Sequence, residues 1–500
     1  MQIFFIMLNI IQFFNKFVNK EKLIKFFSLS MLMFLILLNQ NIIRNVSTSI
    51  IVIKLGTESI SFIKLWIQLP LGLGFMLLNI KLMNIITSEQ IFRVITSIFL
   101  VFFFCFAFIL FPNVEFFHPQ ESIVNNLVSN FPYLKWFFLL WGSWCYVLFF
   151  TITDFWPVVI VLLFYWQLAN KINSVKEATK IYVPIGIVSQ SNMIFASAIL
   201  SYFASGDHFL LPFFEKIYDQ TEIFLKSTTV IVCITGVFIL IFHRYIEIHN
   251  IDSLTKFKVK NKRIDVLSYG IIKSLKLIFT SKYLILAFLV TVSYSICVHM
   301  IEGLWFSRAK ALYSSTEEFS QYQSNVLLIT SIVALFFTLI GSLMLKYFGW
   351  FFTIAITPVM FCIFGSIFFI LTIFVNRFYN LVDLLNISKD FLLQITILFA
   401  SLQNIFGKGA KYSLYDSTKE MVYIPLDDEM KNKGKIAVTL LGAQIGKAFG
   451  SLIQFLSFTF YPNAQHEDIA EFLFFWFFVT CIIWIWFLKL LNNLYHEKLH

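Results

Sequence analysis

Long apolar runs, separated by short polar segments, dominate the pattern of residues along this chain. A helix that crosses a bilayer needs about 20 mainly apolar residues, and runs of about that length recur throughout. They are predicted at about 27–45, 59–80, 91–112, 136–169, 180–204, 226–243, 283–306, 325–345, 350–375, 391–415, 436–460 and 470–492. The pattern therefore predicts an all-α membrane protein with about twelve transmembrane helices.

The run at 136–169 is too long for one straight span, and it contains Asp154 and Pro157. It is either two spans or one long kinked helix, because proline removes a backbone hydrogen bond and bends a helix. The run before Lys419 is also longer than a span requires. Since the two runs share this excess, we count one span in each.

Basic and acidic residues alternate between successive loops, and the segment 247–282 is strongly basic. Lysine and arginine gather in the loops that are inside if both chain ends are cytoplasmic. The carboxylates of the opposite loops are Glu115, Glu121, Asp207, Glu215, Asp219, Glu222, Glu317, Glu318, Glu467, Asp468 and Glu471. By the positive-inside rule, this asymmetry predicts an even number of spans with both termini in the cytoplasm.

The basic segment divides the spans into two sets of six, which is the layout of a major-facilitator-like transporter. Two short echoes favour a parallel duplication: KLW at 64–66 with GLW at 303–305, and YVPI at 182–185 with YIPL at 423–426. Their offsets are nearly equal and close to half the chain. The predicted parts are a cytoplasmic or interfacial segment 1–26, six-helix bundles 27–246 and 283–494, a linker 247–282 and a cytoplasmic tail 495–500.

Composition restricts the class of protein further. Of the 500 residues, 59% are hydrophobic and 13% are charged, whereas a soluble domain carries about 25% charged residues. The net charge of +10 lies in short loops, so the positive-inside rule explains it and we expect no nucleic-acid partner. The six cysteines lie in apolar runs without a C-x-x-C pair, which predicts core thiols.

Several charged residues fall inside the predicted spans, where each costs at least about 2.5 kcal/mol near the bilayer centre. For Lys64, Asp154 and Lys447 the position favours a polar cavity between helices. For Arg44, Lys408 and Glu302 a near-interface position with snorkelling side chains is an equal alternative. The full set is Arg44, Lys64, Asp154, Glu302, Lys408, Lys411 and Lys447.

A cationic cavity with one or two carboxylates suits an anionic, phosphorylated substrate. Lysines attract phosphates as point charges. The carboxylates can hold those lysines while no substrate is bound, and such ion pairs can act as the switches of an exchanger. The predicted ligand is therefore a phosphate-bearing molecule, and we expect no cofactor.

Other motifs say less about function. The segment GAQIGKA at 442–448 is one residue short of a P-loop, and Ala448 stands where a magnesium-binding Ser or Thr belongs, so an ATPase is rejected. His299 precedes Glu302 by one turn and is predicted to pack in the core. Trp66 and Trp156 neighbour Lys64 and Asp154 in sequence and are candidates to stack on a base.

The chain resembles the non-mitochondrial ATP/ADP translocases, the nucleotide transporters of intracellular bacteria and plastids. The resemblance runs from about residue 40 to 460. Its segments are ISFIKLWIQLP at 60–70, DFWPVVIVLLFYWQLAN at 154–170, VKEATKIYVPIG at 175–186, IEGLWFSRAKALY at 301–313, FGWFFTIAITP at 348–358, KYSLYDSTKEMVYIPLDDEMKNKGK at 411–435 and IGKAFGSLIQ at 445–454. Such a resemblance implies a twelve-span antiporter or symporter.

The resemblance also implies roles by position. Lys64, Glu302 and Lys447 match functional residues of the second, seventh and eleventh spans, and Asp154 matches a position that is usually Glu in the fourth span. Gln190 stands where an Asn is common. Other departures are Ser47-Thr48 for a Lys-Asp pair, Thr439 for an Asp, and Ala448-Phe449-Gly450 for Ser-Gly-Gly. These departures leave the substrate open.

We interpret the chain as an alternating-access carrier that exchanges ATP for ADP. Arg44, Lys64 and Lys447 would bind phosphates, Asp154 and Glu302 would form gating pairs, and Gln190 and Trp156 would lie near the base. The alternative is import of other nucleotides, with or without protons. A membrane enzyme would need a paired-carboxylate or histidine site, and the sequence shows none. A sensor that does not transport would not need the charges within the spans. We expect a monomer in a bacterial inner membrane, with phosphate as a further possible ligand.

Overall fold

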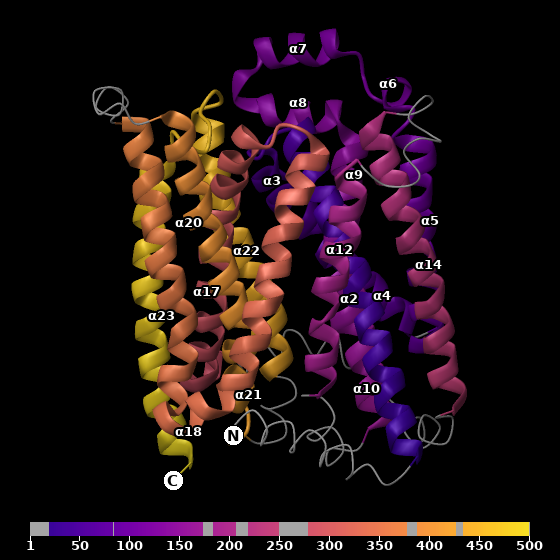
Figure 1. The fold of residues 1–500 in the computed structure, drawn as a ribbon, viewed down its shortest axis with the longest axis vertical. Coiled ribbons are helices and arrows are strands. Elements are labelled where there is room, and N and C mark those ends of the chain that lie inside the picture. The colour runs from indigo at the N-terminus through magenta and orange to yellow at the C-terminus, as the bar shows by residue number, and fades with distance from the viewer. Residues whose placement is uncertain are drawn as a thin grey trace.

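The computed structural model describes residues 20–83, 85–173, 184–206, 219–249, 279–377, 388–426 and 434–499, and these ranges are helical without strands. Long helices run side by side between two ends (Figure 1). The predicted all-α fold class is confirmed. Most of segment 1–26 and of linker 247–282 lies outside the described residues, so the predicted division of the chain stays a prediction.

The helices of the first half are described first. They are α2 (Lys20–Lys54), α3 (Ser59–Phe62), η1 (Ile63–Gln68), α4 (Leu69–Met83), α5 (Ser88–Cys105), η2 (Phe106–Leu110), α6 (Val114–Phe117), α7 (Glu121–Asn130), η3 (Pro132–Leu134), α8 (Lys135–Gly142), α9 (Trp144–Trp156), η4 (Pro157–Tyr165), α10 (Trp166–Ile172), α12 (Asn192–Ala204) and α14 (Gln220–His249). All of these except η3 are α- or π-helices.

The second half contains longer helices. They are α17 (Lys282–Leu312), α18 (Thr316–Arg377), α20 (Lys389–Ala410), η5 (Lys411–Tyr415), α21 (Asp416–Met421), α22 (Lys435–Phe460) and α23 (Ala470–Leu499). The segment α18 joins two predicted spans, which meet at Gly349. That residue has a φ of 79°, a left-handed conformation that glycine adopts without steric cost.

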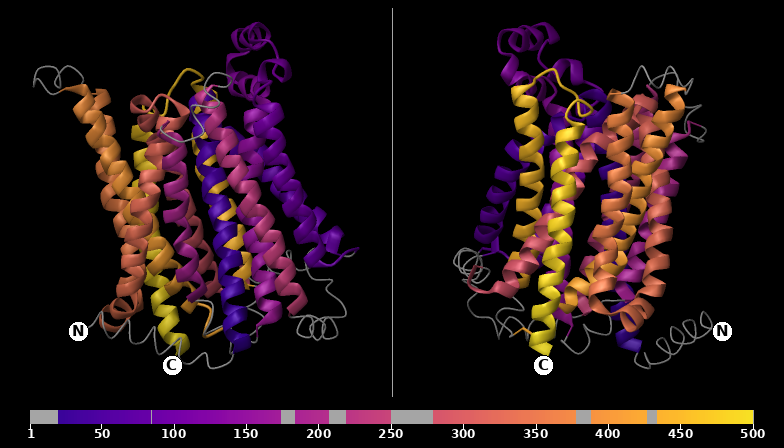
Figure 2. Two further views of the ribbon diagram at one scale, coloured as in Figure 1. Left: turned by 45° about the vertical axis from the view of Figure 1, so that its right-hand side comes forward. Right: turned by 90° about the vertical axis from the view of Figure 1, so that its left-hand side faces the viewer.

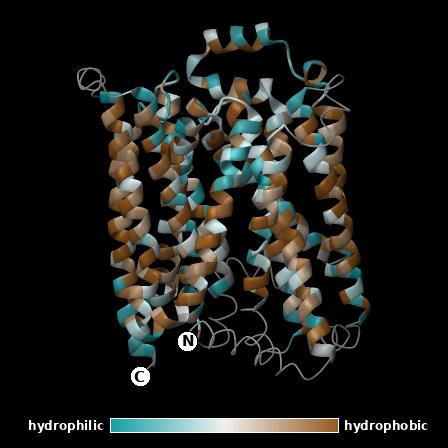
Figure 3. Cartoon of the chain, viewed as in Figure 1, coloured by the Kyte–Doolittle hydropathy of each residue, from teal (hydrophilic) through white to brown (hydrophobic). Residues whose placement is uncertain are grey.

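Ten helices of the described chain are long and apolar enough to cross a membrane. The other two predicted spans, 59–80 and 436–460, are helical too, as α3–η1–α4 and α22. Of the about twelve predicted transmembrane helices, ten are therefore confirmed as candidate spans and the other two as helices. Most residues of these helices are hydrophobic, as the colouring in Figure 3 shows, and Ile98, Phe352 and Trp486 are exposed examples.

The fourth span starts later than the sequence predicted. Residues 135–142 form the separate helix α8, which packs against α7, and the span itself runs from Trp144 to Ile172. The helix continues past Pro157 because the proline begins the π-helical segment η4, where the altered hydrogen-bond register accommodates the missing N–H. We call the end that carries α7 and α8 the outer end, following the predicted orientation (Figure 1).

Two groups of helices make up the described part of the molecule, the orange-to-yellow helices beside the indigo-to-magenta ones (Figure 1). In the first half α2 packs against α9, α12 and α14, and in the second half α17 packs against α22 and α23 while α18 packs against α20. The halves touch through α12 and α18. Near the outer end they share one apolar core, since Ile60 and Phe62 of the first half belong to the same buried cluster as Ile301 and Phe306.

Candidate functional site

Lys64 anchors the first contact between the two halves. It lies in the π-helical segment η1 and only 7% of its surface is exposed. Its Nζ is 2.8 Å from Glu302 Oε2 on α17, and Arg44 on α2 places an NH2 group 3.4 Å from the other carboxylate oxygen. The structure therefore brings together three residues that the sequence singled out as charges within spans.

A second contact has the opposite polarity. Asp154 on α9 accepts a hydrogen bond from Lys447 on α22, with 3.0 Å between Oδ2 and Nζ. Here the first half supplies the anion and the second half supplies the cation. Lys64 and Arg44 also lie within electrostatic reach of Asp154. We call Arg44, Lys64, Asp154, Glu302 and Lys447 the charge cluster.

The snorkelling alternative does not suit Glu302, because its side chain is buried between the halves and paired with two cations. Arg44 differs, since 46% of its side chain is exposed. At 4 Å and an effective dielectric constant near 20, opposite charges attract by about 4 kcal/mol. The cluster can therefore hold the halves together, and a polyanion can compete for its cations.

His299 contacts the charge cluster, which corrects the prediction that it packs in the core. Its Nδ1 lies 3.1 Å from Lys64 Nζ and 3.4 Å from Glu302 Oε2. Residues three apart on a helix share a face. The three-residue spacing of His299 and Glu302 in the sequence is the signal that indicates this shared position.

Two further lysines lie beside the cluster. Lys411, in the π-helical segment η5, pairs with Asp416 at 3.0 Å and lies over the ring of Tyr412. Lys408 lies over the ring of Trp305, with 5.7 Å from Nζ to the ring centre. Its charge interacts with Glu302, Arg44 and Lys64, yet no carboxylate oxygen of the described residues lies within 4 Å of its Nζ.

Gln190 also lies beside these residues. Its Nε2 donates a hydrogen bond to the carbonyl oxygen of Tyr412 in η5, at 3.2 Å. Its Oε1 is buried and has no hydrogen-bond partner among the described residues. A buried acceptor without a partner is costly, so this amide oxygen is suited to receive a ligand donor.

Trp156 does not lie in the cluster, which corrects its candidate role in base stacking. The side chain is fully buried, and its Nε1 donates to the carbonyl oxygen of Ile36 at 3.1 Å. Its ring packs against Phe99 and Phe103. The residue follows Asp154 by two positions, which places it on another face of the helix, so no ring face is free for a base. Trp66 is half-exposed and contacts Phe137 and Phe455.

The P-loop-like segment is part of the continuous helix α22, so it forms no phosphate-binding loop. Its Gly446 serves helix packing: an added Cβ would lie 2.6 Å from the carbonyl oxygen of Val292 on α17. Close approach of two backbones explains the glycine, and the rejection of an ATPase motif agrees with this geometry.

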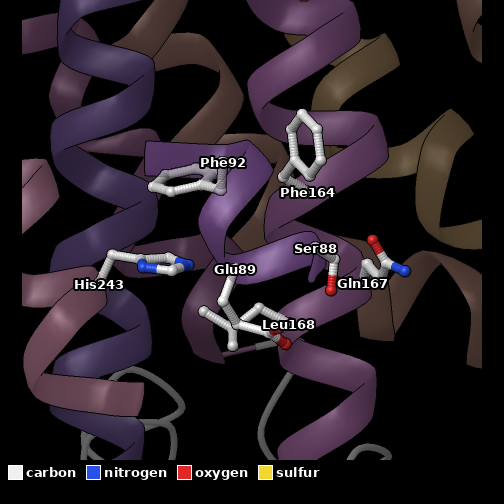
Figure 4. Close-up of a pocket in the computed structure, with 7 residues that line it drawn as sticks. All are labelled: Ser88, Glu89, Phe92, Phe164, Gln167, Leu168 and His243. Atoms are coloured by element: carbon white, nitrogen blue, oxygen red, sulfur yellow. The ribbon is translucent and has the colours of Figure 1, made fainter. Parts of the chain in front are cut away.

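One small polar pocket lies near the inner end of the first half (Figure 4). Its volume is about 10 Å³, room for about one water molecule, so it cannot hold a nucleotide. Lys171 pairs with Glu89 at its edge, and His243 stacks on Phe92 with 4.1 Å between ring centres. The lining residues are Ser88, Glu89, Phe92, Phe164, Gln167, Leu168 and His243.

The helical architecture, with charged contacts between its halves, defines the class of fold: a multi-pass helical membrane protein whose helices are arranged as in major-facilitator transporters. The inward-open xylose transporter XylE from E. coli superimposes with a TM-score of 0.53 at 9% identity, over 93% of this chain and 96% of that one. Its partially occluded form gives 0.52 at 12% identity, over 94% and 98%. These likenesses show the fold.

Sequence relatives identify the family. A family profile described as TLC ATP/ADP transporter matches residues 9–495. The chain is 35% identical over 491 residues to ADP,ATP carrier protein 3 of Rickettsia bellii, covering 96% of each. It is 34% identical over 491 residues to ADP,ATP carrier protein 4 of Rickettsia prowazekii, covering 96% of this chain and 94% of that one. The chain belongs to the TLC ATP/ADP transporter family.

Proposed function

We propose that this protein exchanges ATP for ADP across a membrane by alternating access. The observation that carries the proposal is the pair of ion pairs between the halves, Lys64–Glu302 and Asp154–Lys447, in a chain of this family. The ADP,ATP carriers of Rickettsia, by their names, handle the same two nucleotides. No covalent chemistry and no cofactor are part of the proposal.

Phosphate groups would compete with the carboxylates for the lysines. In the empty carrier, Lys64 and Lys447 are neutralised by Glu302 and Asp154. A nucleotide brings three to four negative charges, and charge-assisted hydrogen bonds to phosphate are about twice as strong as neutral ones. Lys64, Lys447 and Arg44 would bind the phosphates, and the released carboxylates would let the halves move.

The base would lie near Gln190. Its buried Oε1 lacks a donor among the described residues, and the amino group of adenine is a donor. Trp156 is not part of this proposal, because its ring is enclosed in the core.

Lys408 would be a further phosphate ligand, since it can bind an anion without breaking an ion pair. A hydrogen bond to a charged group contributes about 1.5–3 kcal/mol. We therefore expect Lys408→Gln to raise the KM for ATP at least about tenfold and to raise that for ADP less, because ADP carries fewer charges. Uptake kinetics with both labelled nucleotides measure this, with the exposed Lys489→Gln as the matched control. An unchanged KM for ATP would remove Lys408 from the site.

We further infer a location in the inner membrane of a bacterium that lives inside host cells, with both termini in the cytoplasm and the protein acting as a monomer. The first described helix begins, and the last one ends, at the same end of the molecule (Figure 2). The carboxylate-bearing helices α6 and α7 lie at the opposite end (Figure 1). Both observations support the predicted orientation of the two bundles, 27–246 and 283–494, in which the basic linker 247–282 lies on the cytoplasmic side.

The test is uptake of labelled ATP by intact bacterial cells that express this chain, with unlabelled ADP, GTP, CTP and phosphate as competitors. We expect ATP to enter, ADP to compete best, and preloaded ADP to leave in exchange. Entry of another nucleotide with no entry of ATP would overturn the substrate assignment. If correctly inserted protein moved no nucleotide at all, the transporter proposal would fail.

A further inference from the structure

A histidine closes the outer end of the molecule. His466, in the turn between α22 and α23, is fully buried. Its Nδ1 lies 3.0 Å from Thr57 Oγ1 and 3.3 Å from Glu58 Oε1, in the turn between α2 and α3. Its Nε2 lies 3.1 Å from Gln454 Oε1. These contacts join the first half to the second, and we call Glu58 and His466 the outer pair.

Hydrogen-bond roles around the ring can be assigned. The carbonyl oxygen of His299 can only accept, so Gln454 must donate to it through Nε2, at 2.7 Å. The Oε1 of Gln454 then faces His466, and the ring must carry a proton on Nε2 to donate to it. The other ring nitrogen, Nδ1, faces a carboxylate, which is an acceptor when ionised. A neutral ring would therefore point a lone pair at Glu58.

One proton resolves this conflict. Thr57 can donate to a neutral Nδ1, but a buried carboxylate would still lie 3.3 Å from the lone pair. A proton between Nδ1 and Glu58 gives both groups a favourable contact. Burial raises the pKa of Glu58, but the hydrogen bond and charge of His466, with a smaller effect of Lys310, bring that pKa below its ordinary value. Glu58 is therefore the anionic partner of this contact.

The other charged groups around the outer pair are occupied elsewhere. Lys310 donates to the carbonyl oxygen of Ile53 at 3.3 Å, and Lys135 donates to that of Pro462 at 3.0 Å. Arg308 lies 3.7 Å from Glu467. The rings of His466 and Phe458 pack in a T-shaped arrangement, and Asp468 accepts from the backbone N–H of Gln465.

We propose that Glu58 and His466 form a proton-binding site that is complete only when the outer end is closed. Closure assembles the pair and binds one proton, and opening exposes the two groups to water and releases it. The proposal rests on alternating access, but it concerns a different part of the molecule from the charge cluster.

The outer pair is connected to the charge cluster through one segment of α17. Gln454 binds the backbone of His299, whose ring contacts Lys64. Gly303 follows Glu302, and an added Cβ there would lie 2.3 Å from His466 Nε2. Because Gly303 leaves this space, His466 packs directly on the turn that carries Glu302. Proton binding at the outer end therefore favours the arrangement in which Glu302 holds Lys64.

The sign of the pH effect follows from linkage. Closing binds a proton, so closure is favoured at low external pH and loses stability as the pH rises. An imidazole in water loses its proton near pH 6.5. Above that pH the ratio of closed to open protein should fall by up to tenfold per pH unit.

The test measures opening of the outer end without any nucleotide. Ser320 is fully buried on α18 and hydrogen-bonds across the halves to Asn45. Ser320→Cys would be labelled with a membrane-impermeant maleimide in intact cells at external pH 6 to 8, and the six native cysteines of the unsubstituted chain set the background. In Glu58→Gln, the amide N–H can donate to a neutral His466, so closure no longer needs a proton.

We expect labelling of Ser320→Cys to rise between pH 6 and pH 8, and this rise to be at least about tenfold larger than in the double variant Ser320→Cys, Glu58→Gln. The double variant corrects for the pH dependence of the reactivity of the thiol itself. His466→Gln should flatten the profile as well. Glu115→Gln, which changes an exposed carboxylate on α6, should not. Equal profiles with and without Glu58 would overturn the proton site. ATP uptake measured in parallel reports on the proposed function separately, because the labelling needs no substrate.

Discussion

Lys64→Ala is expected to lower ATP–ADP exchange at least about a hundredfold. The substitution removes a phosphate ligand and also leaves Glu302 buried without its nearest cation, which was 2.8 Å away. A hydrogen bond to a charged group contributes about 1.5–3 kcal/mol, the unpaired carboxylate also repels the incoming phosphates, and about 1.4 kcal/mol in a barrier corresponds to a tenfold change in rate. Arg44 contacts Glu302 only at 3.4 Å from a half-exposed position, so it cannot replace Lys64.

The measurement is the initial rate of exchange of labelled ATP against preloaded ADP, normalised to the amount of inserted protein. Lys489→Ala, an exposed lysine of α23, is the matched control and should exchange at the wild-type rate. Lys64→Arg restores the charge with a different shape, and it should recover part of the activity. Exchange by Lys64→Ala at more than a third of the wild-type rate would exclude Lys64 from the phosphate site.

The sequence could identify the members of the charge cluster because charges in a bilayer are costly and must have a partner. It could not pair them. Lys64 and Glu302 are 238 positions apart, and the π-helical segment η1 around Lys64 changes the direction of its side chain relative to a regular helix. Only the packing of one half on the other determines which carboxylate meets which lysine.

Other residues could not be placed because sequence neighbours do not share a helix face. Trp156 follows Asp154 by two positions and points into the core, whereas His299 precedes Glu302 by three and points into the cluster. The outer pair was missed for another reason: Glu58 and His466 lie in loops, where polar residues are expected to face water. Contacts between the halves bury them, and no periodicity in the sequence reports such contacts.

The two ion pairs of the cluster have opposite polarity across the interface between the halves. The first half offers a lysine in one pair and an aspartate in the other, and the second half offers the complement. Both pairs connect the halves, so both must break when the halves separate at this level. In the empty carrier both ion pairs would stay formed and hold the halves together. The unloaded transporter would therefore not reorient across the membrane.

Neutralising both carboxylates should therefore convert an exchanger into a leaky carrier. In the double variant Asp154→Asn, Glu302→Gln, we expect net efflux of nucleotide without any external counter-substrate to rise at least about tenfold relative to exchange. The amides keep the shape of the side chains but no longer attract Lys447 and Lys64 as full charges, so the empty carrier can reorient. Efflux of labelled ATP from preloaded vesicles, with and without external ADP, gives the ratio.

Glu89→Gln, which breaks an ion pair to Lys171 inside the first half, is the matched control and should keep obligatory exchange. A double variant that still requires external ADP for efflux would show that these pairs do not lock the empty carrier, since no charge would then connect the halves at either position.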